Sequence, residues 1–432
     1  MRVRVRPADL LRAAILAAPI VLLLILAWRR AVPVPFGDDF SALLTLRPIL
    51  LGEGSAMEGL WAPHMESRFV TVRAAMLLLG VLTGWNFSLM TLAVPLLAAL
   101  NAFLLLRVLR PALDRLSAPE RDAFRFLVVA TSVSPVAWES WSTSYFLTTH
   151  LAFTFFLAAA LLLREAPPRI GMPLAAAACA LCSLSFIHGF SSWVLLLPLL
   201  PRRRLAAAWL LAGAALFLAY AWGMQDRLAA GPVAAFMQET PARAVAYAFA
   251  LLGMPAETVD VRLGAAAGAA VVLGLFVAGL LASRGGAGRA LLPAFCAYAF
   301  GLVSALAVVA GRLAQPLSLY GPLSSRYLVM TLPAVLCCIA LVAALGGRRT
   351  ARIMAACLIA AHLAAVPSAL RQWDLVAARK EAGLACLSTP DFSDSCLRSL
   401  VWWEPEWVRA AVPVLVEIGI PVEGGDPGES SR

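Results

Sequence analysis

The sequence has little charge and almost no lysine. Only 14% of its 432 residues are charged and 61% are hydrophobic, whereas a soluble domain carries charge on about a quarter of its residues. The net charge of +10 comes almost entirely from arginine, because Lys380 is the only lysine. These arginines stand in short gaps between apolar runs, which is the pattern of a membrane protein rather than of a nucleic-acid binder. We therefore expect membrane lipids around the chain and no nucleic acid partner.

Common cofactor motifs are also missing. The sequence contains neither the glycine-rich loop of P-loop nucleotide-binding proteins nor a dinucleotide-binding glycine motif. No internal repeat is evident, and no stretch has the composition of a soluble nucleotide-sugar domain. These absences argue against a soluble nucleotide as the source of an activated group.

The eight cysteines fall into two groups. Six lie within apolar runs, where a thiol usually serves as a small buried hydrophobe: Cys179, Cys182, Cys296, Cys337, Cys338 and Cys357. The spacing of Cys179 and Cys182 is that of a metal or redox site, but no second pair accompanies it. The other two, Cys386 and Cys396, lie in the polar C-terminal segment. We expect a disulfide between them if that segment lies outside the cytoplasm.

What the chain has in abundance is apolar runs, and a helix needs about 20 such residues to cross a bilayer. The sequence predicts an all-α, polytopic transmembrane bundle of about eleven spans: 10–28, 87–109, 124–140, 145–163, 170–187, 190–200, 205–223, 263–283, 291–310, 327–345 and 353–370. The first is expected to be an uncleaved helix, because no small-x-small cleavage site follows it. The run at 190–200 is too short to cross unaided.

Two further segments leave the number of spans open. The stretch 68–84 has a helical pattern that Arg73 interrupts, and we expect an interfacial or re-entrant helix there. The same expectation holds for 242–252. Twelve spans is the alternative, if 68–84 crosses fully.

The arginine-rich gaps set the expected orientation, because positively charged loops stay in the cytoplasm. The N-terminus is then cytoplasmic and the C-terminus lies outside. Residues 1–370 form the membrane domain, with a large first outer loop at 29–86 that carries interfacial helices. Residues 371–432 form a small outer tail. The first outer loop, three later outer loops and the tail thus bring their polar residues to one face.

Two adjacent carboxylates, Asp38 and Asp39, lie early in the first outer loop. Their mutual repulsion raises the pKa of one of them, which makes it a candidate base that deprotonates an acceptor hydroxyl. In the alternative interpretation, Gly37-Asp38-Asp39 is a turn that caps a short helix at 41–50. A third possibility divides these roles between the two carboxylates.

Further candidates follow in the same loop. His64 and Glu66, together with Asp38 or Asp39, have the side chains of a divalent-metal site. They are equally suited to orient a phosphate-bearing substrate through Arg68 and Arg73. An ordinary solvated loop is the structural alternative.

Later outer segments add aromatic and cationic candidates. Arg312 and Arg326-Tyr327 flank a loop at the outer ends of two spans, where an arginine pairs with a phosphate or extends to lipid headgroups. Trp138 and Glu139 stand near the same surface, as a sugar-stacking pair or as members of the aromatic belt. His188 sits at a helix break, and it either lines a cavity or forms a hydrogen bond inside the bundle.

This layout resembles the GT-C superfamily of integral membrane glycosyltransferases, especially bacterial members. Four features carry the resemblance: Asp38-Asp39 after the first helix, His64-x-Glu66-x-Arg68, the break at 185–190, and Ser325-Arg326-Tyr327. The sequence departs from many relatives, which have His-Arg or Glu-His where this chain has Glu66-Ser67-Arg68.

The resemblance implies a polyprenyl-phosphate sugar as donor and a glycan, lipid or protein outside the cytoplasm as acceptor. Asp38 or Asp39 would be the base, and Arg312 or Arg326 would hold the donor phosphate. The expected location is the bacterial inner membrane. Three other classes stay open: a transporter or flippase of lipid-linked saccharides, a polysaccharide polymerase or ligase, and an assembly protein without catalytic activity.

Overall fold

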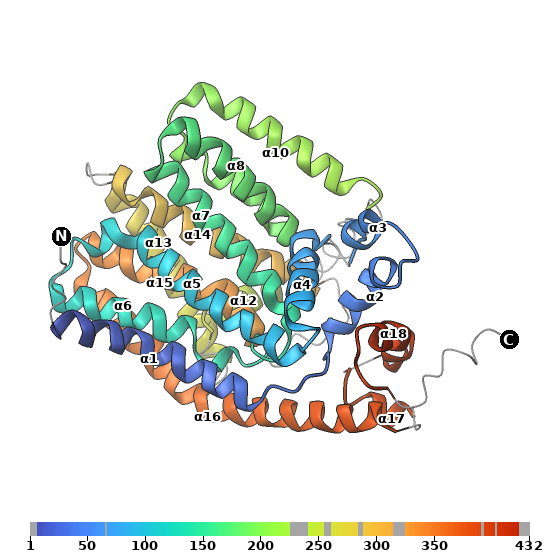
Figure 1. Ribbon diagram of the computed structural model, residues 1–432. Helices are drawn as coiled ribbons and strands as arrows, with labels where there is room; N and C mark the ends of the chain where they lie inside the picture. Colours follow the sequence, from blue (N-terminus) through green and yellow to red (C-terminus); the bar gives the residue numbers. More distant parts are fainter. Residues whose placement is uncertain are drawn as a thin grey trace.

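The computed structural model describes residues 7–64, 67–224, 241–254, 261–283, 288–313, 325–389, 393–401 and 404–422. These residues form helices joined by turns, and no β-strand occurs among them. The prediction of an all-α protein with several apolar helices is therefore confirmed (Figure 1).

The long helices begin and end at residues that suit those positions. Ser117 and Glu120 form a reciprocal capping box at the start of α6 (Ala118–Ser132). Pro168 opens α8 (Pro168–Ser185), where its missing N–H costs no hydrogen bond. Gly84 ends α4 (Val70–Thr83) with a φ of 60°, a left-handed conformation that glycine adopts without a Cβ clash.

The other helices, in chain order, are α1 (Pro7–Arg29), α2 (Asp38–Leu50), α3 (Ala56–Trp61), α5 (Phe87–Leu113), α7 (Leu147–Glu165), α9 (Ser192–Leu195), α10 (Ala206–Ala221), α12 (Pro241–Leu252), α13 (Val261–Ser283), α14 (Gly288–Leu313), α15 (Leu328–Ala344), α16 (Arg348–Leu387), α17 (Asp394–Leu397) and α18 (Pro405–Glu417). Short 3₁₀ helices lie between them: η1 (Pro135–Ala137), η2 (Ser144–Phe146), η3 (Ile187–Ser191), η4 (Leu197–Leu199), η5 (Arg203–Leu205) and η7 (Ser325–Tyr327).

Seven helices of the described chain are long and apolar enough to cross a membrane. They are Pro7–Arg29, Phe87–Leu113, Ser144–Glu165, Pro168–Ser185, Gly288–Ala310, Ser325–Ala344 and Arg348–Leu387. Each overlaps one of the predicted spans. The predicted segments 190–200 and 205–223 coincide with shorter apolar helices, and 263–283 falls on α13.

The prediction of a span at 124–140 was wrong in its bounds. Helix α6 ends at Ser132, and the chain continues through η1 and a series of turns to η2. The hydroxyl of Ser134 accepts the N–H of Val136, and the Trp141 indole donates to the carbonyl of Ser134 at 2.9 Å. These local bonds hold residues 134–142 as a compact loop rather than as a continuing helix.

The segment predicted to be interfacial is the 14-residue helix α4. At 1.5 Å per residue it rises about 21 Å, which is less than the roughly 30 Å of a hydrocarbon core. Exposed Leu78, Val81 and Leu82 line its C-terminal half, whereas Arg73 on the opposite face is buried. The second such segment is the 12-residue helix α12.

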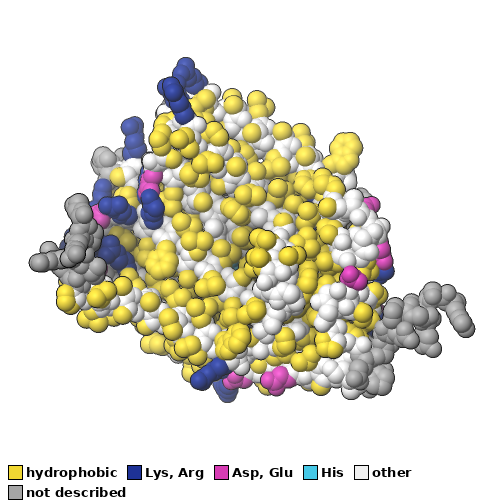
Figure 2. Space-filling model, viewed as in Figure 1, with side chains coloured by type: hydrophobic (Ala, Val, Ile, Leu, Met, Phe, Trp, Pro, Cys, Tyr) yellow, Lys and Arg dark blue, Asp and Glu magenta, His cyan; other side chains and the backbone are white. Residues whose placement is uncertain are grey.

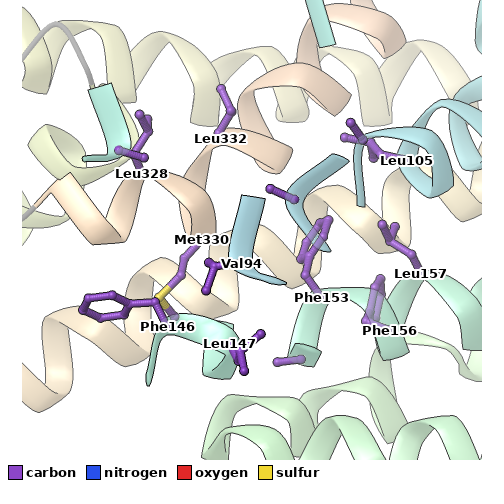
Figure 3. Close-up of a cluster of buried hydrophobic side chains, with 14 of the residues drawn as sticks. Val94, Leu105, Phe146, Leu147, Phe153, Phe156, Leu157, Leu328, Met330 and Leu332 are labelled. Carbon is purple, nitrogen blue, oxygen red and sulfur yellow. The ribbon is translucent and has the colours of Figure 1, made fainter. Parts of the chain in front are cut away.

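The core of the bundle lies between α5, α7, α14 and α15. In the α15 span 83% of the residues are buried, against 11% in the α1 span, so α15 is central and α1 peripheral. Figure 3 shows Val94 of α5, Phe153 of α7 and Leu332 of α15 in this cluster. Apolar contacts of this kind, rather than buried charges, hold the spans together.

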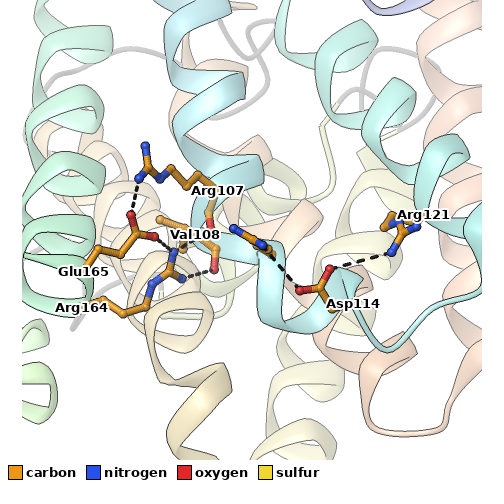
Figure 4. A network of polar contacts seen from close by, with 7 residues as sticks. Arg107, Val108, Asp114, Arg121, Arg164 and Glu165 are labelled. Atoms are coloured by element: carbon orange, nitrogen blue, oxygen red, sulfur yellow. Dashed lines mark hydrogen bonds and ion pairs between the residues drawn. The ribbon is translucent and has the colours of Figure 1, made fainter. Parts of the chain in front are cut away.

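The two ends of the bundle differ in charge. Figure 2 shows dark-blue side chains gathered mainly at the left end of the molecule, while most of the visible surface is apolar. Ion pairs between different helices lie at this basic end: Arg12–Asp122, Arg107–Glu165 and Arg352–Glu120. Arg164 also donates to the backbone carbonyls of Arg107 and Val108 (Figure 4).

The opposite end carries the first loop and the C-terminal segment. Helix α16 runs without a break from Arg348 to Leu387, so it crosses the predicted domain boundary at residue 370. It then leads to α17 and on to α18, and α18 lies beside α2 at the right of Figure 1. Cys386 and Cys396, for which we expected a disulfide, are joined.

Candidate functional site

The acidic pair stands at the start of α2, in a turn that requires glycine. Gly37 precedes the helix with a φ of 57° and a ψ of −118°, a conformation that a side chain strongly disfavours. Its N–H donates to the carbonyl of Leu400 in the C-terminal segment at 2.9 Å. Both Asp38 and Asp39 lie in the first turn of the helix, where the macrodipole favours negative charge.

Asp39 points inward and its carboxylate is occupied. Its Oδ1 accepts the hydroxyl of Ser144 at 2.7 Å and the N–H of Tyr145 at 3.0 Å, and its Oδ2 accepts the N–H of Phe36 at 3.2 Å. Only 1% of the residue is exposed. Asp39 therefore joins the first outer loop to residues 134–146, the loop that contains η1 and η2 and is named the 134–146 loop below. These contacts fit the structural role that the sequence left open for one of the two carboxylates.

Burial has a defined effect on the protonation of Asp39. It raises the pKa of this carboxyl above its usual range, because the charged form loses its hydration. The hydroxyls of Ser144 and Thr143 and the charge of Lys380 act in the opposite direction, because they stabilise the anion.

Asp38 is partly exposed and meets an arginine from the other half of the chain. Its Oδ2 lies 3.7 Å from a guanidinium nitrogen of Arg326, and 19% of the Asp38 side chain stays exposed. The Arg326 side chain is 14% exposed. Unlike Asp39, Asp38 combines a charged partner with access to solvent.

A third carboxylate, Glu139, holds the backbone beside this ion pair. Its Oε2 accepts the N–H of Arg326 at 3.1 Å, and its own N–H donates to the hydroxyl of Ser325 at 3.1 Å. The 134–146 loop and η7 are thereby tied together. The structure thus brings together Asp38, Glu139 and Arg326, three of the predicted residues, from three separate parts of the sequence.

Aromatic rings surround the Arg326 guanidinium. Its central carbon lies 5.6 Å from the centre of the Phe146 ring and 5.3 Å from that of Tyr327, within the range of cation–π attraction. Both rings therefore contribute to holding the guanidinium beside Asp38. An arginine fixed in this way, with partial exposure, is suited to receive an anionic group.

The two other first-loop arginines hold the backbone. Arg68 donates to the carbonyls of Trp61, Tyr220 and Trp222, the second at 2.8 Å. Arg73 donates to the carbonyls of Leu60 and Ala62, the first at 3.1 Å. Both are buried. This arrangement favours structural roles over the phosphate contact that we predicted for them.

His64 lies beside the turn at residues 36–40, which carries Asp38 and Asp39 and is named the acidic turn below. Its Nδ1 is 2.9 Å from the hydroxyl of Ser41, and its ring lies 5.7 Å from that of Tyr145. Glu66, its predicted partner in a metal site, lies outside the described residues. Among the residues that are described, no three His, Cys, Asp or Glu side chains come together as a metal site.

The remaining predicted residues lie around or below this site. Trp138 is half-buried in the loop that carries Glu139. His188 is buried in η3, with its ring 4.7 Å from Phe186 and 5.4 Å from Phe300. Those contacts place it inside the bundle. Arg312 belongs to α14, but its side chain is not among those described.

Sequence reasoning missed Lys380 as a site residue. Its ammonium group donates to the carbonyl of Ser142 and lies 5.4 Å from the centre of the Phe36 ring. The sequence did mark this residue, because a single lysine in a chain that otherwise uses arginine is unusual. Ser144 and Ser325 were also missed, since isolated serines give no sequence signal.

Comparison of the chain with protein-family models, with curated proteins and with solved structures gives no match.

Proposed function

We propose that the protein is a membrane glycosyltransferase that moves a sugar from a polyprenyl-phosphate carrier to an acceptor outside the cytoplasm. The pairing of Asp38 with Arg326 carries this proposal. A partly exposed carboxylate and a cation between aromatic rings lie together at one end of an apolar bundle. A lipid-borne donor would meet both groups at the membrane surface.

Of the two adjacent carboxylates, Asp38 is the better candidate for the base. Both oxygens of Asp39 already accept hydrogen bonds, and its side chain is buried. Successive residues of a helix point about 100° apart. One carboxylate is therefore directed into the protein while its neighbour keeps partial access to solvent, so the two roles divide between Asp39 and Asp38.

The proposed reaction has one displacement step. Asp38 accepts the proton of an acceptor hydroxyl as that oxygen attacks the anomeric carbon of the sugar. The bond between the anomeric carbon and the phosphate oxygen breaks, and polyprenyl phosphate leaves with the electron pair. Arg326 faces the phosphate and stabilises the negative charge that develops on it.

The charge difference between the ends of the bundle supports the expected orientation. Basic loops stay in the cytoplasm, so the arginine-rich end would face inward and the Asp38 end outward. A bacterial inner membrane with an outward-facing site matches a donor that has been carried across on its lipid. This orientation places the disulfide of the C-terminal segment in an oxidising compartment.

The first experiment would follow release of polyprenyl phosphate from labelled polyprenyl-phosphate sugars by the purified protein in lipid nanodiscs, with membrane lipids and glycans as acceptors. The matched variants are Arg326→Met and Arg30→Met. Both remove an ion-paired arginine, but Arg30 pairs with Asp374 and not with a carboxylate of the acidic turn.

The proposal predicts that wild type and Arg30→Met release the carrier and that Arg326→Met loses at least about a hundredfold in rate. Equal activity of the two variants would move the site elsewhere. If the wild type carried the intact lipid across liposomes without cleaving it, a flippase would be the correct class.

A further inference from the structure

Lys380 is buried between two segments that carry the proposed site. It lies in the last two turns of α16, and only 3% of the residue is exposed. An ammonium group in such a place needs charged or polar partners, because its hydration is lost. Two sets of groups supply them, and they belong to different parts of the chain.

The first segment is the acidic turn. The ammonium nitrogen lies 5.4 Å from the centre of the Phe36 ring, and the N–H of Phe36 donates to Asp39. Burial raises the pKa of the Asp39 carboxyl, and the charge of Lys380 acts against that rise. Lys380 thus lies against the Phe36 end of this turn, whose backbone Asp39 holds.

The second segment is the 134–146 loop. The ammonium group donates to the backbone carbonyl of Ser142. Glu139 of the same loop holds the backbone of Arg326, and Ser144 and Tyr145 donate to Asp39. Lys380 thus reaches both parts that set the distance between Asp38 and Arg326.

We infer that Lys380 is the positioning residue of this site: it holds the acidic turn and the 134–146 loop in register, so that Asp38 faces Arg326. This inference builds on the proposed function, because the residues it positions are the proposed base and the proposed phosphate-binding group. The role needs a cation. An apolar side chain would leave the carbonyl of Ser142 without this donor and the Phe36 ring without the cation beside it.

Hydrogen–deuterium exchange tests this inference without any substrate. The two peptides to follow are 36–46 and 138–147, which contain the amides and carbonyls described above. Lys380→Met should speed exchange in both peptides by about tenfold or more, because both lose the same anchor. Lys380→Arg, which keeps the cation, should restore most of the protection.

The matched control is Arg371→Met. It also replaces a cationic side chain with methionine, at an exposed position of the same helix, and it should leave both peptides as in the wild type. Exchange that rises in Lys380→Met only within α16, and not in the two peptides, would overturn the inference.

A milder variant keeps the test decisive if Lys380→Met does not fold. Lys380→Gln removes the charge but keeps a polar N–H group at the buried position, so it leaves less polar surface unsatisfied. It should fold better than Lys380→Met and still show faster exchange than the wild type in both peptides. Wild-type protection of either peptide in this variant would contradict a positioning role.

Turnover separates this inference from the proposed function. If the wild type releases polyprenyl phosphate, Lys380→Met should lower kcat by about ten- to a hundredfold and raise KM for the donor, because the positions of both Asp38 and Arg326 change, and Lys380→Arg should restore most of both. An unchanged kcat together with unchanged exchange would refute the inference and leave the transferase intact. Absence of wild-type turnover would refute the transferase, and the exchange experiment would still decide the role of Lys380.

Discussion

Two adjacent aspartates have different surroundings in this protein, and that difference is decided at the residue scale. Asp39 receives three hydrogen bonds from two parts of the chain and is buried. Asp38, one residue earlier, faces an arginine and keeps part of its surface exposed. Identical side chains therefore make different contributions to stability and to chemistry.

Stability measurements should separate the two residues. Asp39→Asn replaces an acceptor oxygen with an amide group and leaves a buried donor without its partner. We expect a loss of about 1–3 kcal/mol in unfolding free energy. Asp38→Asn, at a partly exposed ion pair, should cost less than about 1 kcal/mol. Thermal unfolding in one detergent measures both, and equal losses in the two variants would contradict the division of roles.

The raised pKa of Asp39 gives its stabilising effect a defined pH dependence. The folded protein keeps this proton at a pH where the unfolded chain, with an ordinary value of 3.8, has released it. The associated stability is complete below that value and is lost as the pH rises through the raised pKa. The destabilisation by Asp39→Asn should therefore be larger near about pH 4.5 than near about pH 8. Urea unfolding at the two pH values would show it, and the opposite trend would mean that the pKa of Asp39 is lowered in the folded protein.

Sequence reasoning located these residues but did not rank them. The pair Asp38-Asp39, Glu139 and Arg326 were all predicted, because charged groups next to apolar spans are few. Which aspartate points inward depends on the start of α2, and that depends on Gly37 and on a contact with Leu400 far along the chain. Arg68 and Arg73 were predicted to bind phosphate because nothing in a sequence marks the backbone carbonyls that they bond.

At the scale of elements, the first turn of α2 is the part that aims Asp38. Gly37 adopts a positive φ, and its N–H is held by the C-terminal segment. The carbonyls of Phe36 and Gly37 accept the N–H groups of Asp39 and Phe40. A small rotation of this turn would move Asp38 away from Arg326.

Gly37→Ala should therefore lower turnover as well as stability. A Cβ at this conformation costs about 1–3 kcal/mol, and relief of that strain would rotate the turn. Gly52→Ala is the matched control, because Gly52 has a φ of +66° with nothing within 4 Å of an added Cβ. Both variants should lose stability in thermal unfolding, but only Gly37→Ala should lose donor turnover. Equal turnover in the two would mean that the turn does not aim Asp38.

Element boundaries were predicted best where the apolar pattern was longest. The spans at 87–109 and 327–345 lie within or close to α5 and α15. The predicted span at 124–140 failed because its apolar residues continue past Ser132 into a loop held by side chains such as Ser134 and Trp141. Hydropathy does not distinguish such a loop from a helix, since its side chains are as buried as those of a span.

At the scale of the whole molecule, the two ends of the bundle have separate roles. At the basic end, arginines near the ends of helices pair with acids of neighbouring helices. The other end gathers the acidic turn, the 134–146 loop, η7 and the C-terminal segment around the proposed site. Residues far apart in sequence meet there because the spans return the chain repeatedly to the same end.

Reporter fusions would test this orientation. A phosphatase that is active only outside the cytoplasm, joined after Arg432, should be active in a bacterial host. The same reporter placed after Arg169, at the basic end, should be inactive, because basic loops are retained in the cytoplasm. The reverse pattern would place the proposed site inside the cell and remove the argument for a donor carried across on its lipid.

The central claim is that Asp38 activates an acceptor that displaces a sugar from a polyprenyl phosphate. The most direct test compares the initial rate of polyprenyl phosphate release by Asp38→Asn and Asp374→Asn. Asp374 is a matched control, because it is an exposed aspartate that pairs with Arg30 beside the same end of the bundle. The account predicts that Asp374→Asn keeps the wild-type rate and that Asp38→Asn loses about a hundredfold or more. Wild-type release by a folded Asp38→Asn protein would contradict it.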